Sequence, residues 1–202
     1  MLAIHRGSLY TLLLAATLAM LAPVPAEAQD LHPSRRPSPM GIARGELGDA
    51  YLSITYSRPY KRDRENIFGT RESEALVPFG EVWRTGANEA TQLTTTGDIL
   101  VAGKKLPAGT YSVFTTPGEK EWSVHFNTRL MMWGEFARNP ETGKFERSYE
   151  AAKNALSVTV PAGSLEEEVD QFTIAIETAD DGAHLILSWI TTEVRVPLAA
   201  AS

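Results

Sequence analysis

The feature that most constrains the fold of this chain is a set of short segments in which apolar and polar residues alternate. In residues 51–57 (YLSITYS), the apolar side chains of Leu52, Ile54 and Tyr56 share one face. Residues 121–127 (EWSVHFN) repeat the alternation. A period of two is typical of a β-strand with one face against a core. The pattern therefore predicts half-buried strands at both places.

Other segments extend this pattern along the chain. Residues 117–120 (PGEK) predict a hairpin with a type II turn, in which Pro117 and Gly118 take the central positions. Residues 179–184 predict a second hairpin. Many short strands, frequent Gly/Pro turns and little helix predict an all-β fold, an antiparallel β-sandwich of jelly-roll type. The further strands that we expect lie at 91–95, 99–101, 110–116, 156–160, 172–178 and 184–190.

The remaining segments have weaker patterns. The proline-rich residues 29–45 predict an extended leader, and the charged residues 60–77 predict a long surface loop with one helical turn near residues 72–76. Residues 148–155 (SYEAAKNA) indicate a helix of about two turns. Residues 165–170 (LEEEVD) are expected to form a solvated loop. Together these segments leave one β-sandwich domain over residues 46–202.

The N-terminus has the pattern of a secretory signal. A 13-residue apolar run follows His5 and Arg6, and a small-x-small site ends at Ala28. The run is shorter than the ~20 residues that a membrane-spanning helix needs. We therefore expect a signal peptide over residues 1–28, cleavage before Gln29, and a periplasmic or extracellular protein with no stable membrane insertion.

Charge and cysteine content exclude several classes of protein. The net charge is −6, so the chain lacks the basic surface expected of a protein that binds nucleic acid or anionic lipid. It contains no cysteine. A cysteine-free exported domain has no disulfides, so packing must stabilise it, and thiol chemistry and thiolate metal sites are excluded.

The densest group of chemically capable side chains lies in residues 78–91 (PFGEVWRTGANEAT). One interpretation is structural: Arg84 pairs with Glu81 or Glu89, and Trp83 packs into the core. The other is a ligand pocket, because arginine binds carboxylates or phosphates, asparagine donates and accepts, and tryptophan offers a stacking face. The residues concerned are Glu81, Trp83, Arg84, Asn88 and Glu89.

Two residues outside this segment complete the candidate site. Arg58 ends the first strand, where it could approach the same corner. His125 alternates to the outward face of its strand and is either a surface residue or a base or ligand, a role that needs a hydrogen-bonding partner. The spacing of Glu81, Glu89 and His125 specifies no metal site, and no cofactor is expected. The candidate ligand-binding residues are Arg58, Trp83, Arg84, Asn88, Glu89 and His125.

Several segments, in order, resemble a known bacterial family, the domain of unknown function 2911. The resemblance covers about residues 37–197, and VWRTGANEAT carries most of its specificity. It implies an exported single-domain protein with no established activity. The chain departs from the family pattern at residues 60–76, which are longer and more charged. The matching segments are YSRP (56–59), IFG (67–69), VPFGEVWRTGANEAT (77–91), GKKLPAGTYSVFTTPGEKEWSVHFN (103–127), WG (133–134) and LSVTV (156–160).

Three classes of function remain open. The favoured one is a non-catalytic binding module for a small polar ligand, a sugar or a carboxylate. The second is a hydrolase that uses His125 or the Glu81/Glu89 pair, although the chain lacks the common hydrolase, P-loop and dinucleotide motifs. The third is a structural or interaction protein of the cell envelope. An exposed Trp83 or Trp133 beside the arginines would favour the first class, two carboxylates facing each other in a cleft the second, and a fully packed motif with no cleft the third.

Overall fold

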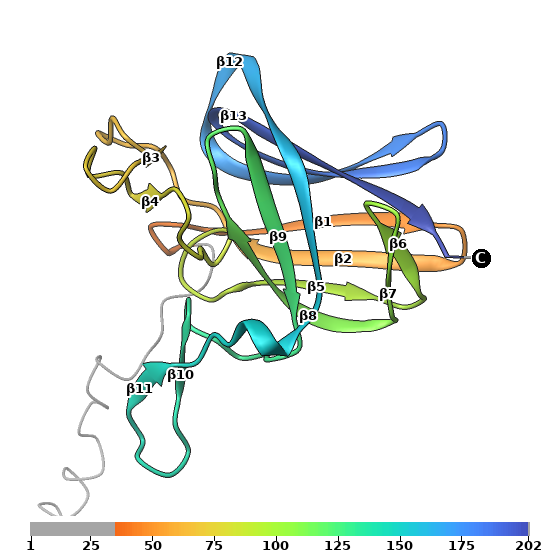
Figure 1. Ribbon diagram of the computed structural model, residues 1–202, viewed down its shortest axis with the longest axis horizontal. Helices are drawn as coiled ribbons and strands as arrows, with labels where there is room; N and C mark the ends of the chain where they lie inside the picture. Colours follow the sequence, from red (N-terminus) through yellow and green to blue (C-terminus); the bar gives the residue numbers. More distant parts are fainter. Residues whose placement is uncertain (1–34, 202) are drawn as a thin grey trace, which may run out of the picture. The chain divides into compact units, whose positions relative to one another are not determined.

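The structure, a computed structural model, describes residues 35–201 of the chain. The predicted signal peptide and the start of the predicted leader lie outside the described residues. Figure 1 shows strands joined by loops, with no long helix. In residues 35–201 no helix has both the length and the apolar character needed to cross a membrane.

Nine strands form one hydrogen-bonded sheet in which neighbouring strands run antiparallel (Figure 1). Their order across the sheet is β1-β2-β5-β8-β9-β12-β13-β6-β7. The predictions of an all-β class and of antiparallel pairing are confirmed. The strands are β1 (Met40–Leu47), β2 (Ala50–Ser57), β5 (Thr91–Thr95), β6 (Ile99–Val101), β7 (Lys104–Leu106), β8 (Gly109–Thr116), β9 (Glu121–Asn127), β12 (Asn154–Ala179) and β13 (Gly182–Ala200).

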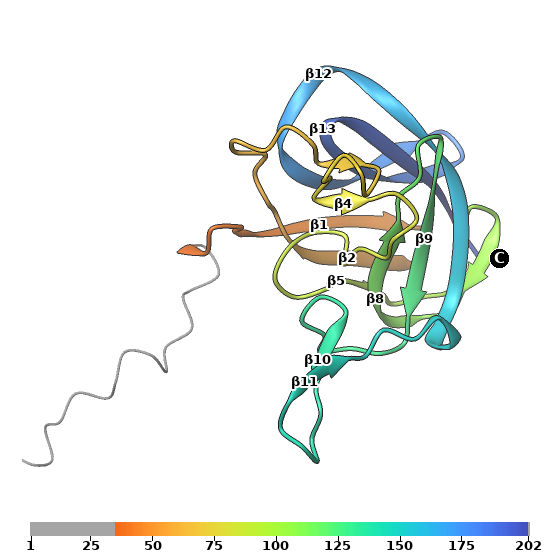
Figure 2. The same ribbon diagram turned by 60° about the vertical axis from the view of Figure 1, so that its left-hand side comes forward.

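The long strand β12 joins the two sides of this sheet. Its first part, Asn154 to Pro161, pairs with β9, and from Ala162 onwards it pairs with β13. Figure 2 shows β12 curving from β9 over to β13. A jelly roll of two separate sheets is not confirmed, because the hydrogen bonding continues through β12 from one side to the other.

The C-terminal part of the chain differs from the three strands that were predicted. The strands expected at 156–160 and 172–178 belong to a single strand, and the prediction of a loop at 165–170 is wrong. Register shifts between Ser164 and Val169, and again before Thr173, let β12 carry these polar residues while it stays paired with β13. The predicted hairpin after β12 is confirmed, because Ala179 pairs with Gly182.

The boundary between leader and domain also differs from the prediction. Strand β1 begins at Met40, inside the segment 29–45 that was expected to be a leader. Its residues pair with β2 along their whole length, and Ala43 and Leu47 are buried. This edge strand has no clear alternation of apolar and polar residues, because only two of its side chains enter the core. The pairing with β2 supplies the hydrogen bonds that stabilise it.

The hairpin between β8 and β9 is confirmed, but its turn is not of type II. That turn requires a positive φ at its third residue, and Gly118 is not among the glycines with positive φ. Four residues, Pro117 to Lys120, separate the strands, so a longer loop replaces the tight turn. Glycine is needed there for space, since a Cβ on Gly118 would lie 2.6 Å from the backbone oxygen of Glu121.

The predicted helices are also wrong. Residues 148–155 form only a single 3-10 turn, η4 (Ala151–Lys153), and residues 72–76 contain no helix. Strand β12 begins directly after η4, and its pairing with β9 satisfies the backbone groups that a second helical turn would have used. Two small sheets complete the fold: β3 (Phe68–Gly69) with β4 (Val77–Pro78), and β10 (Phe136–Arg138) with β11 (Phe145–Arg147).

Two apolar clusters lie on opposite faces of β8. Val113 belongs to the main core, whereas the neighbouring Phe114 belongs to a small cluster with Ala90, Met132 and Ala137. Successive side chains of a strand point to opposite faces. The segment that follows β9 therefore covers the outer face of the sheet around Phe114. This places residues 128–153 next to the 78–91 corner.

Candidate functional site

The 78–91 segment is a corner held against β8. Trp83 and Thr115 exchange two backbone hydrogen bonds of 2.7 and 2.9 Å, which fix the direction of the chain. Thr85 and Asn88 have φ values of 53° and 57°, in the left-handed region. These two residues turn the backbone sharply on either side of Gly86.

Trp83 packs inward, as predicted from the sequence. It is 9% exposed, and its indole Nε1 donates to the backbone oxygen of Gly86 at 3.0 Å. Its ring stacks on Trp189 with centroids 6.0 Å apart and meets Phe172 edge-on at 5.1 Å. The corner is thus anchored to the core through an aromatic cluster.

The prediction that Arg84 pairs with Glu81 or Glu89 is wrong. The Arg84 guanidinium donates from Nη1 to the backbone oxygen of Asn88 at 2.9 Å. Glu81 pairs instead with Arg71, and Glu89 accepts two hydrogen bonds from Arg36. The left-handed turns at Thr85 and Asn88 lie between Arg84 and Glu89, whereas Glu81 precedes them; each of the two carboxylates meets an arginine from another segment.

Arg84 instead lies against the loop before β10. A Cβ on Gly134 would lie 2.9 Å from its guanidinium carbon, so glycine leaves the space that this side chain occupies. Burial lowers the pKa of the Arg84 guanidinium, and the charge of nearby Glu135 opposes that shift. Arg84 is therefore a partly buried cation, and no described carboxylate forms an ion pair with it.

Asn88 ties the corner to the residues before β1. Its side-chain amide donates to the backbone oxygen of Ser38 and to the hydroxyl of Ser57, both at 3.2 Å. With the Arg36–Glu89 pair, this bond holds residues 36–39, which we call the N-terminal strap. Within the described residues, the strap is the proline-rich part of the predicted leader that precedes β1.

The side chains of Arg58 and His125 have hydrogen-bonding partners outside this corner. Arg58 donates to the Phe172 backbone oxygen at 3.3 Å and to the Thr173 hydroxyl at 2.9 Å, which ties the end of β2 to β12. The His125 ring nitrogens contact the hydroxyls of Thr116 and Ser157 at 3.0 and 2.9 Å.

Burial lowers the pKa of His125, which favours the neutral ring. Since His125, Glu81 and Glu89 each have different partners, the structure does not bring them together. Within residues 35–201 no group of three or more His, Asp or Glu side chains is arranged to hold a metal ion.

A cavity of about 360 Å³ opens beside the corner, and we call it the arginine–tryptophan cavity. It brings together Trp83, Arg84 and Asn88 of the predicted site, but not Arg58, Glu89 or His125. Among residues 35–201, its lining contains no Asp or Glu. The lining residues are Pro37, Ser38, Pro59, Tyr60, Arg62, Arg64, Leu76, Val77, Trp83, Arg84, Gly86, Ala87, Asn88, Trp133 and Trp189.

The charged loop after β2 contributes two cavity residues that sequence reasoning did not select. Arg62 donates to the Pro37 backbone oxygen at 3.0 Å, and Arg64 donates to the backbone oxygen of Tyr60. The Nε atom of Arg64 is buried and has no hydrogen-bonding partner. The alternation in residues 61–65 (KRDRE) could have indicated these two residues in the sequence. Arg62 and Arg64 line the cavity, and the intervening Asp63 does not.

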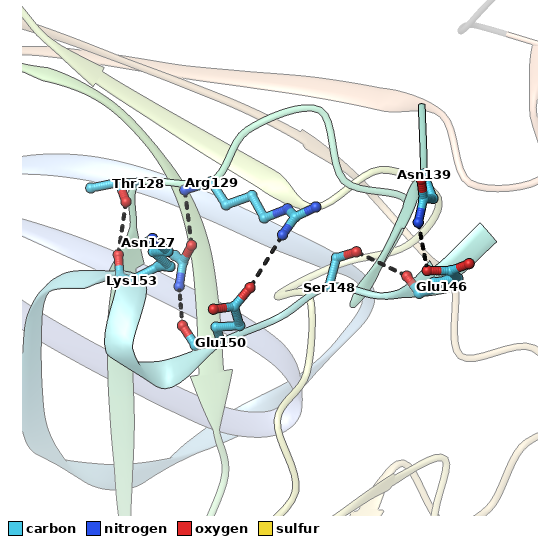
Figure 3. A network of polar contacts seen from close by, with 8 residues as sticks. All are labelled: Asn127, Thr128, Arg129, Asn139, Glu146, Ser148, Glu150 and Lys153. Carbon is cyan, nitrogen blue, oxygen red and sulfur yellow. Dashed lines mark hydrogen bonds and ion pairs between the residues drawn. The ribbon is translucent and has the colours of Figure 1, made fainter. Parts of the chain in front are cut away.

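Trp133 reaches the cavity from residues 128–153, and a polar network supports that segment (Figure 3). The buried Asn127 side chain donates to the Glu150 backbone oxygen at 3.0 Å and accepts from the Arg129 backbone N–H at 2.9 Å. Arg129 also pairs with the Glu150 carboxylate at 3.3 Å. Both ends of the segment are thereby fixed at the end of β9.

Comparison with known proteins identifies the family. A family model described as a protein of unknown function (DUF2911) matches residues 38–198. The chain belongs to the DUF2911 family. The matched range includes the whole corner and nearly all of the cavity, and it confirms the resemblance inferred from the sequence motifs. No curated protein and no solved structure matches the chain.

Proposed function

We propose that this DUF2911 protein is a non-catalytic binding module for a small anionic ligand, held in the arginine–tryptophan cavity. The observation that carries the proposal is the composition of the lining, to which the described part of the chain gives three guanidinium groups, three tryptophans and no carboxylate. A concave site with apolar walls and a few converging polar groups is the usual form of a small-molecule site. Its volume, about 360 Å³, is in the range of such sites.

The charge of the lining favours a carboxylate over a neutral sugar. Guanidinium groups form paired hydrogen bonds with carboxylate or phosphate oxygens. Each of the three cavity arginines is oriented by a bond to a backbone carbonyl, which leaves its other N–H groups for a ligand. The indole of Trp133, 46% exposed, offers a surface for the apolar part of the ligand.

We propose further that the protein acts outside the cytoplasm, after removal of residues 1–28. The support is the apolar run at residues 9–21 and the small-x-small site that ends at Ala28. N-terminal sequencing of the exported protein is expected to begin at Gln29. Membrane-bound material that retains Met1 would contradict this proposal.

Calorimetric titration of the purified protein with carboxylates, phosphates and neutral sugars tests the binding function. We expect anions to bind and Arg84→Gln to weaken their binding at least tenfold, the effect of losing one charge-assisted bond. Arg44→Gln is the matched control, because Arg44 is exposed and lies outside the cavity lining. Failure of every anion to bind would refute the proposal and favour a structural role in the envelope.

A further inference from the structure

The cavity arginines lack ion-pair partners in the described part of the chain, although the charge of Glu135 acts on Arg84. Arg62, Arg64 and Arg84 form no ion pair within residues 35–201, although the protein as a whole is acidic. Their side-chain hydrogen bonds go to backbone carbonyls, which carry only partial charge. Three positive charges therefore line one small cavity, and among residues 35–201 no carboxylate in its lining compensates them.

The carboxylates closest to the corner in sequence or space are already engaged. Each accepts from an arginine that does not line the cavity, and each of these pairs is at least partly exposed. The contacts are those of Glu81 with Arg71, Glu89 with Arg36, and Glu135 with Arg147. None of these carboxylates enters the cavity lining.

Burial makes this charge imbalance costly. Arg64 and Arg84 are both partly buried, and the Arg64 Nε atom lacks any hydrogen-bonding partner. A cation removed from water needs an opposite charge or hydrogen-bond acceptors to offset its lost hydration. A ligand with one negative charge would leave at least one of these two guanidinium groups without a counterion. Arg62 is exposed and adds a third cation.

We propose that the ligand of the arginine–tryptophan cavity is a small organic dianion with an apolar body, of the dicarboxylate or phosphate monoester type. This inference rests on the proposed anion-binding function and specifies its ligand class. The two acidic charges compensate Arg64 and Arg84. The apolar body contacts the exposed faces of Trp133 and Leu76.

A series of compounds with one common body tests the number of charges. Benzoate carries one negative charge, isophthalate carries two carboxylates, and phenyl phosphate carries nearly two charges on one group at pH 8. We expect isophthalate or phenyl phosphate to bind at least tenfold more tightly than benzoate in calorimetric titrations, because the second charge adds a charge-assisted bond. The tighter of the two then identifies separated carboxylates or a phosphate group.

Two results would overturn the inference in distinguishable ways. If benzoate binds within twofold of both dianions, the ligand is not selected as a dianion, but the anion-binding function stands. If none of the three compounds binds, both proposals fail. Benzyl alcohol, the neutral compound with the same ring, is the control for the apolar body.

Arginine variants test which cavity residues compensate the two charges of the ligand. Arg64→Gln and Arg84→Gln should each reduce the preference for dianion over benzoate to less than threefold, whereas the exposed Arg44→Gln should leave it unchanged. Arg62→Gln provides a cavity variant at an exposed position, so its folding does not depend on buried packing. We expect it to weaken dianion binding with an unchanged melting temperature. A dianion preference that persists in all three cavity variants would contradict the inference.

Discussion

Two tryptophans of the cavity have different roles, and their substitution separates folding from binding. Trp83 is 9% exposed in the aromatic core, so Trp83→Ala should lower the free energy of unfolding by ~3–5 kcal/mol. Trp133 is 46% exposed, so Trp133→Ala should change stability by less than ~1 kcal/mol while weakening ligand binding. Urea unfolding and titration calorimetry on both variants measure these effects. Equal loss of stability in the two variants would contradict the assignment.

His125 predicts a specific dependence of stability on pH. Burial lowers its pKa in the folded protein, so the unfolded chain binds the proton more readily. The stabilisation is therefore present above the unfolded pKa of ~6.5 and is lost as the pH falls through that value towards the lower folded pKa. The free energy of unfolding, measured in urea, should decrease as the pH is lowered from 7.5 to 5.5. In His125→Gln the free energy of unfolding should fall less over this pH range. A variant with the same pH dependence as the wild type would refute the role of His125.

The β8–β9 hairpin shows how an element can require glycine without a left-handed turn. A Cβ on Gly118 meets the Glu121 backbone oxygen at 2.6 Å, whereas a Cβ on Gly80 meets nothing within 4 Å. Gly118→Ala should therefore cost ~1–3 kcal/mol through overpacking. Thermal melting measures the loss. If Gly118→Ala has the melting temperature of the wild type, the loop accommodates the added methyl group and the overpacking argument is wrong.

The segment between β9 and β12 depends on one buried side chain. Asn127→Ala removes the donor to the Glu150 backbone oxygen and the acceptor of the Arg129 N–H, which should cost ~0.5–1.5 kcal/mol for each part-buried hydrogen bond lost (Figure 3). Limited proteolysis should then cleave residues 128–153 faster, and ligand binding should weaken with the position of Trp133. Arg44→Gln, at an exposed position outside this segment, is the control and should be cleaved at the wild-type rate.

At the scale of the whole molecule, the cavity is assembled from segments far apart in the chain. The N-terminal strap, the loop after β2, the corner, the loop before β10 and strand β13 each contribute residues to its wall. The nine-stranded sheet supplies the common support. Without a cysteine in the chain, packing and hydrogen bonding must hold these segments together.

The N-terminal strap provides a test of this assembly. A chain that begins at Pro39 loses the Arg36–Glu89 pair and the backbone acceptors of Arg62 and Asn88, but keeps all of β1. The Arg36–Glu89 ion pair is partly exposed and worth about 1 kcal/mol or less, so the melting temperature should fall only slightly. Anion affinity should fall on the order of tenfold, equivalent to ~1.4 kcal/mol. A chain that begins at Gln29 is the control, and equal affinity of the two would contradict a role for the strap.

The local pattern of the sequence predicted the strands with a clean alternation, and the inward direction of Trp83 was predicted as well. Alternation in residues 51–57 and 121–127 specifies which side chains are buried, because neighbouring residues of a strand point to opposite faces. The same reasoning missed β1 and divided β12, since an edge strand and a strand with register shifts lack a clean period of two. Their pairing partners stabilise them instead.

Only the tertiary structure decided the partners of the charged residues. Arg84 was expected to pair with a carboxylate within five residues, yet Glu89 pairs with Arg36, 53 residues away. The sequence shows that charges are present, but their partners come from distant segments, and the left-handed turns at Thr85 and Asn88 separate Arg84 from Glu89. A cavity lined by Arg62, Arg84 and Trp133 depends on how distant segments pack, and short-range periodicity carries no information about that packing.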